Sequence, residues 1–360
     1  MKMNIYYSTQ DTFDVSTLLK GVPLSNICGI VLFCQEERSG YHMMLGGFRS
    51  SIKEFLGRDV PVTLVPQPLL PCGGFCAEIY VLDSVEGIEY HEGYGLVKSD
   101  DGALIFIEGI ASSDFSDSVS RQSKEVFSRL DSILSLHGFA PDDIVRQWNY
   151  IGNITRHRDG RQNYQEFNDA RSAYYQRGAW PNGYPAATGI GASFDGIIVG
   201  CIAFRSCGGI YPVNNPLQIA AHEYSKTVLV DNAANAVKST PKFERAKLIE
   251  IGGQAVCFVS GTAAIRGEQS MDAGSASSQT IRTIENIEYL VSRENLVKYG
   301  CKPYDLHCLN LRVYVKNAEV YDEVRSIVEA RYPGIPTIYT VADVCRQELL
   351  VEIEGILTSR

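Results

Sequence analysis

Two features are missing from this sequence of 360 residues, a long apolar run and an excess of positive charge. The longest apolar stretch, residues 196–204, is far shorter than the roughly 20 residues of a membrane-spanning helix. The N-terminus shows no signal-peptide pattern, so we expect a cytoplasmic protein. A formal net charge of −9 argues against nucleic acid or an anionic membrane as the main partner. A small anion could still bind at a local cluster of arginines.

The motifs of common metal and nucleotide sites are missing as well. Cys72 and Cys76 have no second pair of ligands, and the six histidines show no ligand spacing. The glycine-rich residues 188–196 have neither the dinucleotide-binding fingerprint nor the lysine of a phosphate loop. We therefore expect no metal and no cofactor, and we expect the ten cysteines to be reduced thiols.

An internal repeat organises the chain. In both copies an apolar strand ends in a glycine, and an amphipathic helix, an alternating strand, a second helix and a closing strand follow. The first copy has these elements at residues 103–109, 124–138, 141–150, 164–175 and 197–204, and the second has them at residues 255–261, 279–299, 303–315, 320–331 and 349–357. Gly109 and Gly261 are 152 positions apart, as are Gly200 and Glu352, so the copies keep one register.

The repeat predicts an α+β fold of duplicated units, with mixed β-sheets and helices packed on one face. We expect an N-terminal half, residues 1–206, that contains the first copy at about residues 101–206. Residues 207–360 form the second copy. Further strands at residues 29–34 and 77–82 leave open whether residues 1–100 are a third, degenerate copy.

Two glutamates in the closing strand are candidates for chemistry. Strand alternation places Glu352 and Glu354 on one face and their apolar neighbours on the other. A solvent-facing polar strand would show the same pattern. The first copy, however, has Gly200 and Ile202 at the matching positions, so it keeps the strand without the carboxylates.

A basic stretch upstream could bind an anion, because guanidinium groups match carboxylates in a bidentate manner. Its cationic residues are Arg146, Arg156, His157, Arg158, Arg161 and Arg171. Arg156 and Arg158 are equally well explained as a solvated helix face. Arg171 is the better candidate, because it shares a helix face with Phe167 and Tyr164.

The repeated unit resembles the RidA (YjgF) fold. The resemblance rests on Ser260-Gly261 after a strand, Gln279 and Asn286-Ile287 in a helix, and the closing residues 351–354. RidA-like chains assemble as trimers with sites between subunits, so a duplicated chain could form such a cleft internally. The resemblance leaves a monomer and a trimer as alternatives.

Six motifs, in order, are similar to those of the chorismatases of the FkbO and RapK type and their hydroxybenzoate-forming relatives. They are RQWNYI, YQEFNDAR, YPAATGIG, PKFERA, SGTA and CRQELLVE, at residues 146–151, 164–171, 184–191, 241–246, 260–263 and 345–352. The resemblance covers residues 141–360 well and residues 1–140 poorly. Residues 268–274 depart from the family pattern.

This resemblance implies an enzyme that removes the enolpyruvyl group of chorismate as pyruvate. Glu352 would be the general acid on the enolpyruvyl methylene, with a pKa raised by burial. Residues at the family's substrate-binding positions are Arg146, Tyr150, Tyr164, Arg171, Tyr184 and Ala263.

The product subtype stays open between two alternatives. Cys345, seven residues before Glu352, resembles the enzymes that form 3-hydroxybenzoate, and we favour that product. Ala263 is closer to the hydrolases that form 3,4-dihydroxycyclohexa-1,5-diene carboxylate. From other classes, a RidA-type imine deaminase is disfavoured because residues 185–188 and 336–339 lack its arginine. A non-catalytic small-molecule binding module also remains an alternative.

Overall fold

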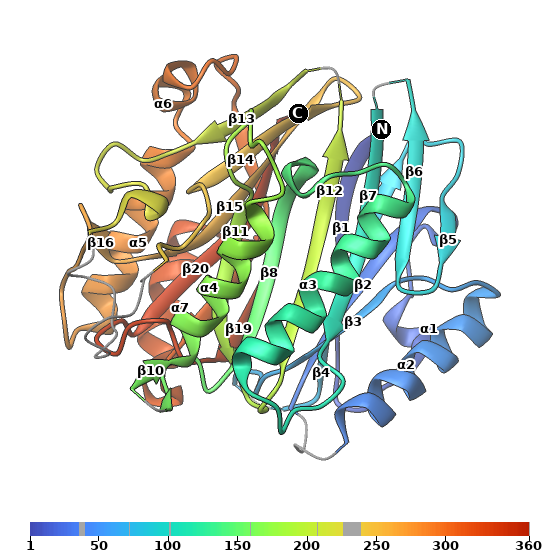
Figure 1. Cartoon of the computed structure of the whole chain (residues 1–360), viewed down its shortest axis with the longest axis horizontal. Coiled ribbons are helices and arrows are strands. Elements are labelled where there is room, and N and C mark those ends of the chain that lie inside the picture. Colours follow the sequence, from blue (N-terminus) through green and yellow to red (C-terminus); the bar gives the residue numbers. More distant parts are fainter. Residues whose placement is uncertain are drawn as a thin grey trace.

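The computed structural model describes all residues except 36–39, 72, 101, 159, 207, 226–238 and 360. Cys72 of the Cys72/Cys76 pair therefore lies outside the described residues. The described residues form three mixed β-sheets with helices on their outer sides and two short two-stranded hairpins, and the two ends of the chain lie close together (Figure 1). Within the described part of the chain, no helix is both long enough and apolar enough to cross a bilayer.

The first sheet has four strands in the order β1-β4-β2-β3. Their bounds are β1 Lys2–Gln10, β2 Ile27–Cys34, β3 Val62–Pro66 and β4 Phe75–Asp83. The helices of this unit are α1 Val15–Leu18, η1 Leu24–Asn26 and α2 Tyr41–Leu56.

The second sheet has six strands in the order β11-β8-β12-β7-β6-β5. Their bounds are β5 Glu89–His91, β6 Tyr94–Ser99, β7 Gly102–Ala111, β8 Ile144–Gly152, β11 Ala186–Ala192 and β12 Ile197–Arg205. The helices are α3 Val119–Leu136, η2 Pro141–Asp143 and α4 Asn163–Tyr175, and a short hairpin pairs β9 His157–Arg158 with β10 Arg161–Gln162.

The third sheet also has six strands, in the order β13-β14-β15-β20-β18-β19. Their bounds are β13 Ile210–Val213, β14 Ala246–Ile251, β15 Gln254–Ala263, β18 Leu306–Val315, β19 Thr337–Val341 and β20 Val351–Ser359. The remaining elements are η3 Ala221–Glu223, β16 Ile265–Arg266, β17 Gln269–Ser270, α5 Ala276–Leu290, α6 Arg293–Lys298, η4 Ala318–Val320 and α7 Tyr321–Arg331.

All three sheets share one strand order. The second sheet from β11 to β5 corresponds strand by strand to the third sheet from β19 to β13, and β3-β2-β4-β1 repeats the first four positions. In each sheet the edge pair is parallel, β11 with β8, β19 with β18 and β3 with β2. The first sheet lacks the opening hairpin, and its first helix has only four residues. Residues 2–83 thus carry a shortened third copy of the strand order, which the sequence pattern leaves open.

Local capping explains two differences from the expected helices. The expected helix at residues 124–138 begins earlier, because the Ser118 side chain accepts a hydrogen bond from the Arg121 N–H at the start of α3. The single helix expected at residues 279–299 is wrong. The Ser292 side chain accepts a hydrogen bond from the Asn295 N–H at 3.2 Å and starts a separate helix, α6.

Each sheet has one face under helices and one face toward the shared interior, as the α+β prediction requires. We call each sheet with its helices a unit. In the second unit, α3 and α4 cover the outer face of the sheet, and Val126 and Phe167 pack there with strand residues (Figure 1). In the third unit, Val351 and Ile353 of β20 pack under α5 and α7. Strand alternation therefore turns Glu352 and Glu354 toward the interior, on the common face that the sequence predicts.

Candidate active site

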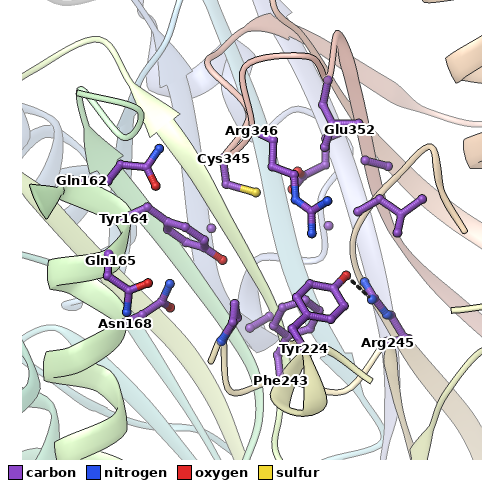
Figure 2. Close-up of a pocket in the computed structure, with 17 residues that line it drawn as sticks. Gln162, Tyr164, Gln165, Asn168, Tyr224, Phe243, Arg245, Cys345, Arg346 and Glu352 are labelled. Atoms are coloured by element: carbon purple, nitrogen blue, oxygen red, sulfur yellow. Dashed lines mark hydrogen bonds between the residues drawn. The ribbon is translucent and has the colours of Figure 1, made fainter. Parts of the chain in front are cut away.

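A cavity lies between the second and third units, beside the Glu352 side chain (Figure 2). One wall comes from the β10–α4 region and from β11, and the other from residues 241–245 before β14, from β15 and from the segment that leads into β20. The lining residues are Gln162, Tyr164, Gln165, Asn168, Ala187, Gly189, Tyr224, Pro241, Phe243, Arg245, Gly261, Ala263, Ile265, Cys345, Arg346, Leu349 and Glu352. Both walls thus come from one chain.

Hydrogen bonds between β11 and β15 join the two units at the cavity. The Ala187 N–H donates to Ser260 Oγ at 2.9 Å, and the Gly261 N–H donates to Thr188 Oγ1 at 3.0 Å. Successive residues of a strand point to opposite faces, so Ala187 and Gly189 line the cavity while Thr188 turns toward the interior. The strand contact therefore fixes the cavity relative to the buried core.

Glu352 is the acid that the geometry favours. Its carboxyl lines the cavity and accepts no hydrogen bond from the described residues. A Cβ atom at Gly261 would overlap Glu352 Oε1, so the carboxyl occupies the space that this glycine leaves open. Burial, and then the negative charge of Glu354, raise the pKa of Glu352 to about 8, against the pull of Arg146 and Arg245. Glu352 therefore holds a proton at neutral pH.

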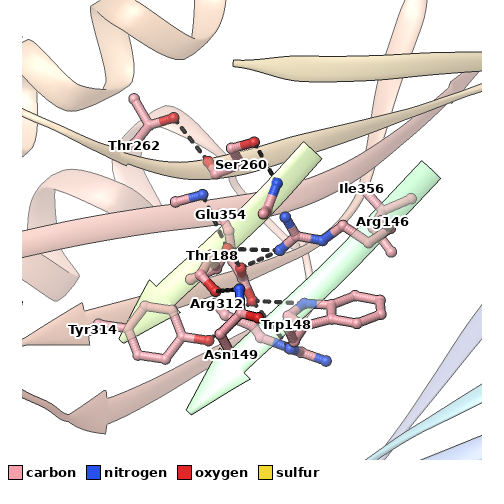
Figure 3. Close-up of polar contacts among 12 residues, drawn as sticks. Arg146, Trp148, Asn149, Thr188, Ser260, Thr262, Arg312, Tyr314, Glu354 and Ile356 are labelled. Atoms are coloured by element: carbon pink, nitrogen blue, oxygen red, sulfur yellow. Dashed lines mark hydrogen bonds and ion pairs between the residues drawn. The ribbon is translucent and has the colours of Figure 1, made fainter. Parts of the chain in front are cut away.

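Glu354, two residues further along β20, has the opposite environment (Figure 3). Its Oε1 accepts hydrogen bonds from Trp148 Nε1 at 3.2 Å, Arg312 Nη1 at 3.0 Å and the Tyr314 hydroxyl at 2.9 Å, and its Oε2 accepts from Arg146 Nη2 and the Thr188 hydroxyl. We call Glu354 and these five donors the Glu354 cluster.

The Glu354 cluster keeps its carboxylate ionised. Burial alone would raise the pKa of Glu354, but the guanidinium groups of Arg146 and Arg312 and the hydroxyls of Thr188 and Tyr314 lower it. Two neighbouring carboxyl groups are thus held in different protonation states. Such a pair is typical of sites where one carboxyl acts as a general acid.

Two arginines in the cavity have no carboxylate partner among the described residues. Arg245 donates from Nη2 to the Tyr224 hydroxyl at 2.6 Å and to the Ile219 carbonyl at 2.9 Å, and its buried Nε has no partner in this part of the chain. Arg346 donates from Nη1 to the Glu268 carbonyl at 2.8 Å. Two guanidinium groups in one cavity, neither of them ion-paired with a described carboxylate, favour an anionic ligand with more than one negative charge.

Cys345 lies between Tyr164 and Arg346, with its sulfur directed into the cavity (Figure 2). Desolvation, and then the charge of Glu352, raise the pKa of the Cys345 thiol to about 12. The thiol is therefore protonated at neutral pH. It is a weak donor beside the acid, not a thiolate.

Half of the residues that the sequence suggests line this cavity. Glu352, Cys345, Tyr164 and Ala263 do so, whereas Arg171 lies behind the wall and donates to Asn168 Oδ1 at 2.6 Å.

The other three predicted residues lie elsewhere. Arg146 and Tyr150 are on the face of β8 that turns to the interior, where Tyr150 accepts a hydrogen bond from Arg312 Nη1 at 3.0 Å. Tyr184 stacks on Tyr175, with ring centroids 5.9 Å apart. These three do not line the cavity, because strand alternation and aromatic packing direct their side chains away from it.

Several lining residues were missed from sequence. Arg245 lies inside the PKFERA motif and Arg346 directly follows Cys345, so both belong to motifs that resemble the family's, although neither was predicted to bind substrate. Asn168 also lies within such a motif, YQEFNDAR, whereas Gln162 and Tyr224 carried no signal of their own. Among the described residues, no group of three or more His, Cys, Asp or Glu side chains is arranged to hold a metal.

The chain is similar in sequence to known chorismatases. The N-terminal model of the FkbO/Hyg5-like chorismatases matches residues 81–203. A 3-hydroxybenzoate synthase of Streptomyces hygroscopicus is 32% identical over 292 residues, which are 78% of this chain and 81% of that protein. A chorismatase of Streptomyces rapamycinicus is 34% identical over 59% of this chain and 64% of its own length.

The fold agrees as well. A crystal structure of a chorismatase covers 99% of this chain and 98% of its own, with a TM-score of 0.74 at 22% identity. The likeness over almost the whole length of both chains shows a common fold. Together with the sequence identity over more than two thirds of a curated relative, it shows that the chain belongs to the chorismatase family.

Proposed function

We propose that the protein cleaves chorismate and releases its enolpyruvyl group as pyruvate. One observation carries the proposal: a protonated, buried carboxyl, Glu352, shares a cavity with the guanidinium groups of Arg245 and Arg346, neither of which is ion-paired with a described carboxylate. Chorismate has two carboxylates and an enol ether whose terminal carbon is basic. The cavity thus offers two cationic groups for the dianion and one acid for the carbon.

The first step is a proton transfer from Glu352 to the terminal methylene carbon. A C–H bond forms from the π electrons of the enol ether, and the neighbouring carbon becomes an oxocarbenium centre. Glu352 is left as a carboxylate, close to the positive charge that the substrate gains. In hydrolysis, a water adds to the oxocarbenium carbon and gives up a proton, the bond between that carbon and the ether oxygen breaks, and the ring oxygen takes a proton as pyruvate leaves. In the reaction to 3-hydroxybenzoate, the ring hydroxyl adds to the same carbon and loses its proton, and the bond from that carbon to the ether oxygen breaks as that oxygen takes a proton. Pyruvate then leaves with the added oxygen, a ring C–H proton is lost, and the ring becomes aromatic. General-acid transfer of this kind typically contributes about 10²–10⁴-fold.

Arg245 and Arg346 would hold the substrate for this transfer. Guanidinium groups bind carboxylates through paired, charge-assisted hydrogen bonds, which fix orientation as well as position. The opposite wall supplies neutral groups, the Tyr164 hydroxyl and the side chains of Gln162 and Asn168, which suit ring oxygens. This arrangement keeps the reacting carbon near the acid, and such positioning is a large part of catalysis.

We favour 3-hydroxybenzoate as the second product, because the Cys345 thiol lies in the cavity beside the acid. Conversion of chorismate to 3-hydroxybenzoate and pyruvate consumes no net water, so an internal nucleophile is sufficient. The alternative is hydrolysis, in which one water adds and 3,4-dihydroxycyclohexa-1,5-diene carboxylate is released. Ala263, which also lines the cavity, supports that alternative. Since both walls come from one chain, we infer that a monomer is complete for either reaction.

Product identification tests the proposal. The purified protein is incubated with chorismate, and products are identified by liquid chromatography and mass spectrometry beside a Glu352→Gln variant. A Glu294→Gln variant, altered at an exposed residue of α6, is the matched control. Pyruvate with 3-hydroxybenzoate supports the favoured reaction, and pyruvate with the dihydroxycyclohexadiene supports hydrolysis. Chorismate that survives a folded wild-type protein would reject the proposed function and favour a binding module.

A further inference from the structure

The acid and its neighbour on β20 differ in how they are held. The carboxyl of Glu352 accepts no hydrogen bond from the described residues, whereas that of Glu354 accepts five. All five donors are N–H or O–H groups, so they fill the acceptor positions of both oxygens and leave no favourable place for a proton. Glu354 is therefore a fixed negative charge near the acid.

The charges in this core balance. Arg312 is bound chiefly by Glu78, whose two oxygens each accept from Arg312 Nε at 3.0 Å. Arg146 is bound by Glu354 and by Thr188 Oγ1, the latter at 2.7 Å, and its Nε and Nη1 have no partner among the described residues. Two carboxylates and two guanidinium groups are thus buried together. Without Glu354, the Arg146 charge would be uncompensated.

Thr188 connects the Glu354 cluster to Gly261, the residue beside the Glu352 carboxyl. Its hydroxyl donates to Glu354 Oε2 and accepts from the Gly261 N–H at 3.0 Å. Gly261 is the residue whose missing side chain makes room for the Glu352 carboxyl. The position of Glu354 and that of Glu352 are therefore coupled through two hydrogen bonds.

Charged and titratable groups face Glu352 from every surrounding element. They are Arg146 on β8, Tyr164 on α4, Arg245 in front of β14, Cys345 and Arg346 before β20, and Glu354 on β20. Arg146 and Arg245 favour the ionised form of Glu352, and Glu354 opposes them. Among these groups, Glu354 is the one whose charge is both negative and fixed by hydrogen bonds.

We propose, on the basis of the proposed function, that Glu354 is a positioning residue of the reaction whose fixed negative charge keeps the proton on Glu352 between turnovers. It does not touch the substrate. Without Glu354, nothing would oppose the effect of Arg146 and Arg245 on the Glu352 carboxyl, which would then ionise at lower pH, and the enzyme would lack its acid. The two carboxylates of β20 thus have separate roles, one as the acid and the other as its electrostatic support.

The test compares a Glu354→Gln variant with a Glu78→Gln variant. Both variants remove one buried carboxylate that binds Arg312. Glu78, unlike Glu354, accepts no hydrogen bond from Thr188, the residue that also binds Gly261 beside the acid. Chorismate turnover is measured against pH for both. We expect the alkaline loss of activity to move down by at least about one pH unit in Glu354→Gln, since a neighbouring cation lowers a carboxyl pKa by about that much. Glu78→Gln should move it less.

Infrared difference spectroscopy follows the same proton without substrate. The carbonyl band of the protonated carboxyl, assigned by its absence in Glu352→Gln, should disappear at lower pH in Glu354→Gln than in the wild type. An unchanged titration of this band would overturn the inference even if chorismate is cleaved. If the band shifts and chorismate is not cleaved, the inference stands for the carboxyl pair and the proposed function fails.

A compensated double variant covers the case in which Glu354→Gln does not fold. Glu354→Gln combined with Arg146→Gln removes one charge of each sign, which avoids an unpaired buried cation. If charge is what matters, the band and the alkaline limb should lie closer to those of the wild type than in the single variant. If the single variant does not fold, the double variant is compared with the wild type alone. A downward shift of the band as large as that expected for the single variant would then show that hydrogen-bond geometry, not charge, sets the protonation of Glu352. This result would overturn the inference.

Discussion

Replacing Glu352 by glutamine should stabilise the protein, and increasingly so as the pH rises. In the folded chain the pKa of Glu352 is raised from its ordinary value of 4.5 to about 8, chiefly by burial. Between these values the unfolded chain loses the proton and the folded chain keeps it. Stability is therefore highest below about pH 4.5 and is lost as the pH rises toward about 8.

The size of the effect follows from the two pKa values. Each pH unit between them corresponds to about 1.4 kcal/mol, so the whole interval amounts to at most about 5 kcal/mol. Glutamine has nearly the same shape and no charge, so it avoids this loss. The free energy of unfolding of Glu352→Gln should exceed that of the wild type by little near the low end of the interval. The gain should reach several kcal/mol at its upper end.

Urea unfolding at a series of pH values measures this difference directly. Glu294→Gln is the control for the substitution itself, because the Glu294 side chain is exposed. Wild-type and Glu352→Gln curves that run parallel from mildly acidic to mildly alkaline pH would refute the reasoning. They would mean that Glu352 is already ionised in the folded protein at neutral pH.

Four further variants, one of them a control, have expected outcomes. Gly261→Ala should lower kcat by at least about 100-fold, because the new Cβ displaces the Glu352 carboxyl, at a cost in stability of about 1–3 kcal/mol. Gly46→Ala, in open space on α2, should instead leave activity unchanged and stabilise slightly, as thermal unfolding and steady-state kinetics will show. Arg346→Gln should raise KM for chorismate about tenfold or more, since a charge-assisted hydrogen bond contributes about 1.5–3 kcal/mol, and an unchanged KM would remove this arginine from the binding site. Cys345→Ala should shift the product ratio from 3-hydroxybenzoate toward the dihydroxycyclohexadiene in the chromatographic assay, and an unchanged ratio would show that the thiol does not select the product.

The sequence predicted the proposed acid more readily than it predicted the proposed anion site. Glu352 was identifiable because one copy of the repeat keeps the carboxylates and the other has Gly200 and Ile202 instead. Cys345 followed from its spacing to Glu352. Arg245 and Arg346 were missed, because an arginine within a motif looks the same whether it faces a cavity or forms a surface ion pair. Their lack of a carboxylate partner is a property of the fold.

The predicted residues that do not line the cavity show where strand alternation no longer tells which face of a strand a ligand would meet. Both faces of β8 are buried, one under helices and one against the shared interior, so no polar face marks the side of the cavity. Arg146 was expected at the substrate and instead binds Glu354, more than two hundred positions along the chain. The shortened first unit was equally hard to recognise, since it lacks the long first helix that makes the repeat visible in the other two.

The dependence of chorismate turnover on pH tests the central claim most directly, namely that a protonated Glu352 delivers the proton. For the wild type, kcat/KM should fall tenfold per pH unit above about pH 8, where the folded protein loses this proton. Glu352→Gln should lose at least about 100-fold of the activity below that pH and show no such limb. A wild-type rate that stays level through this range, or a glutamine variant that retains wild-type turnover, would contradict the account.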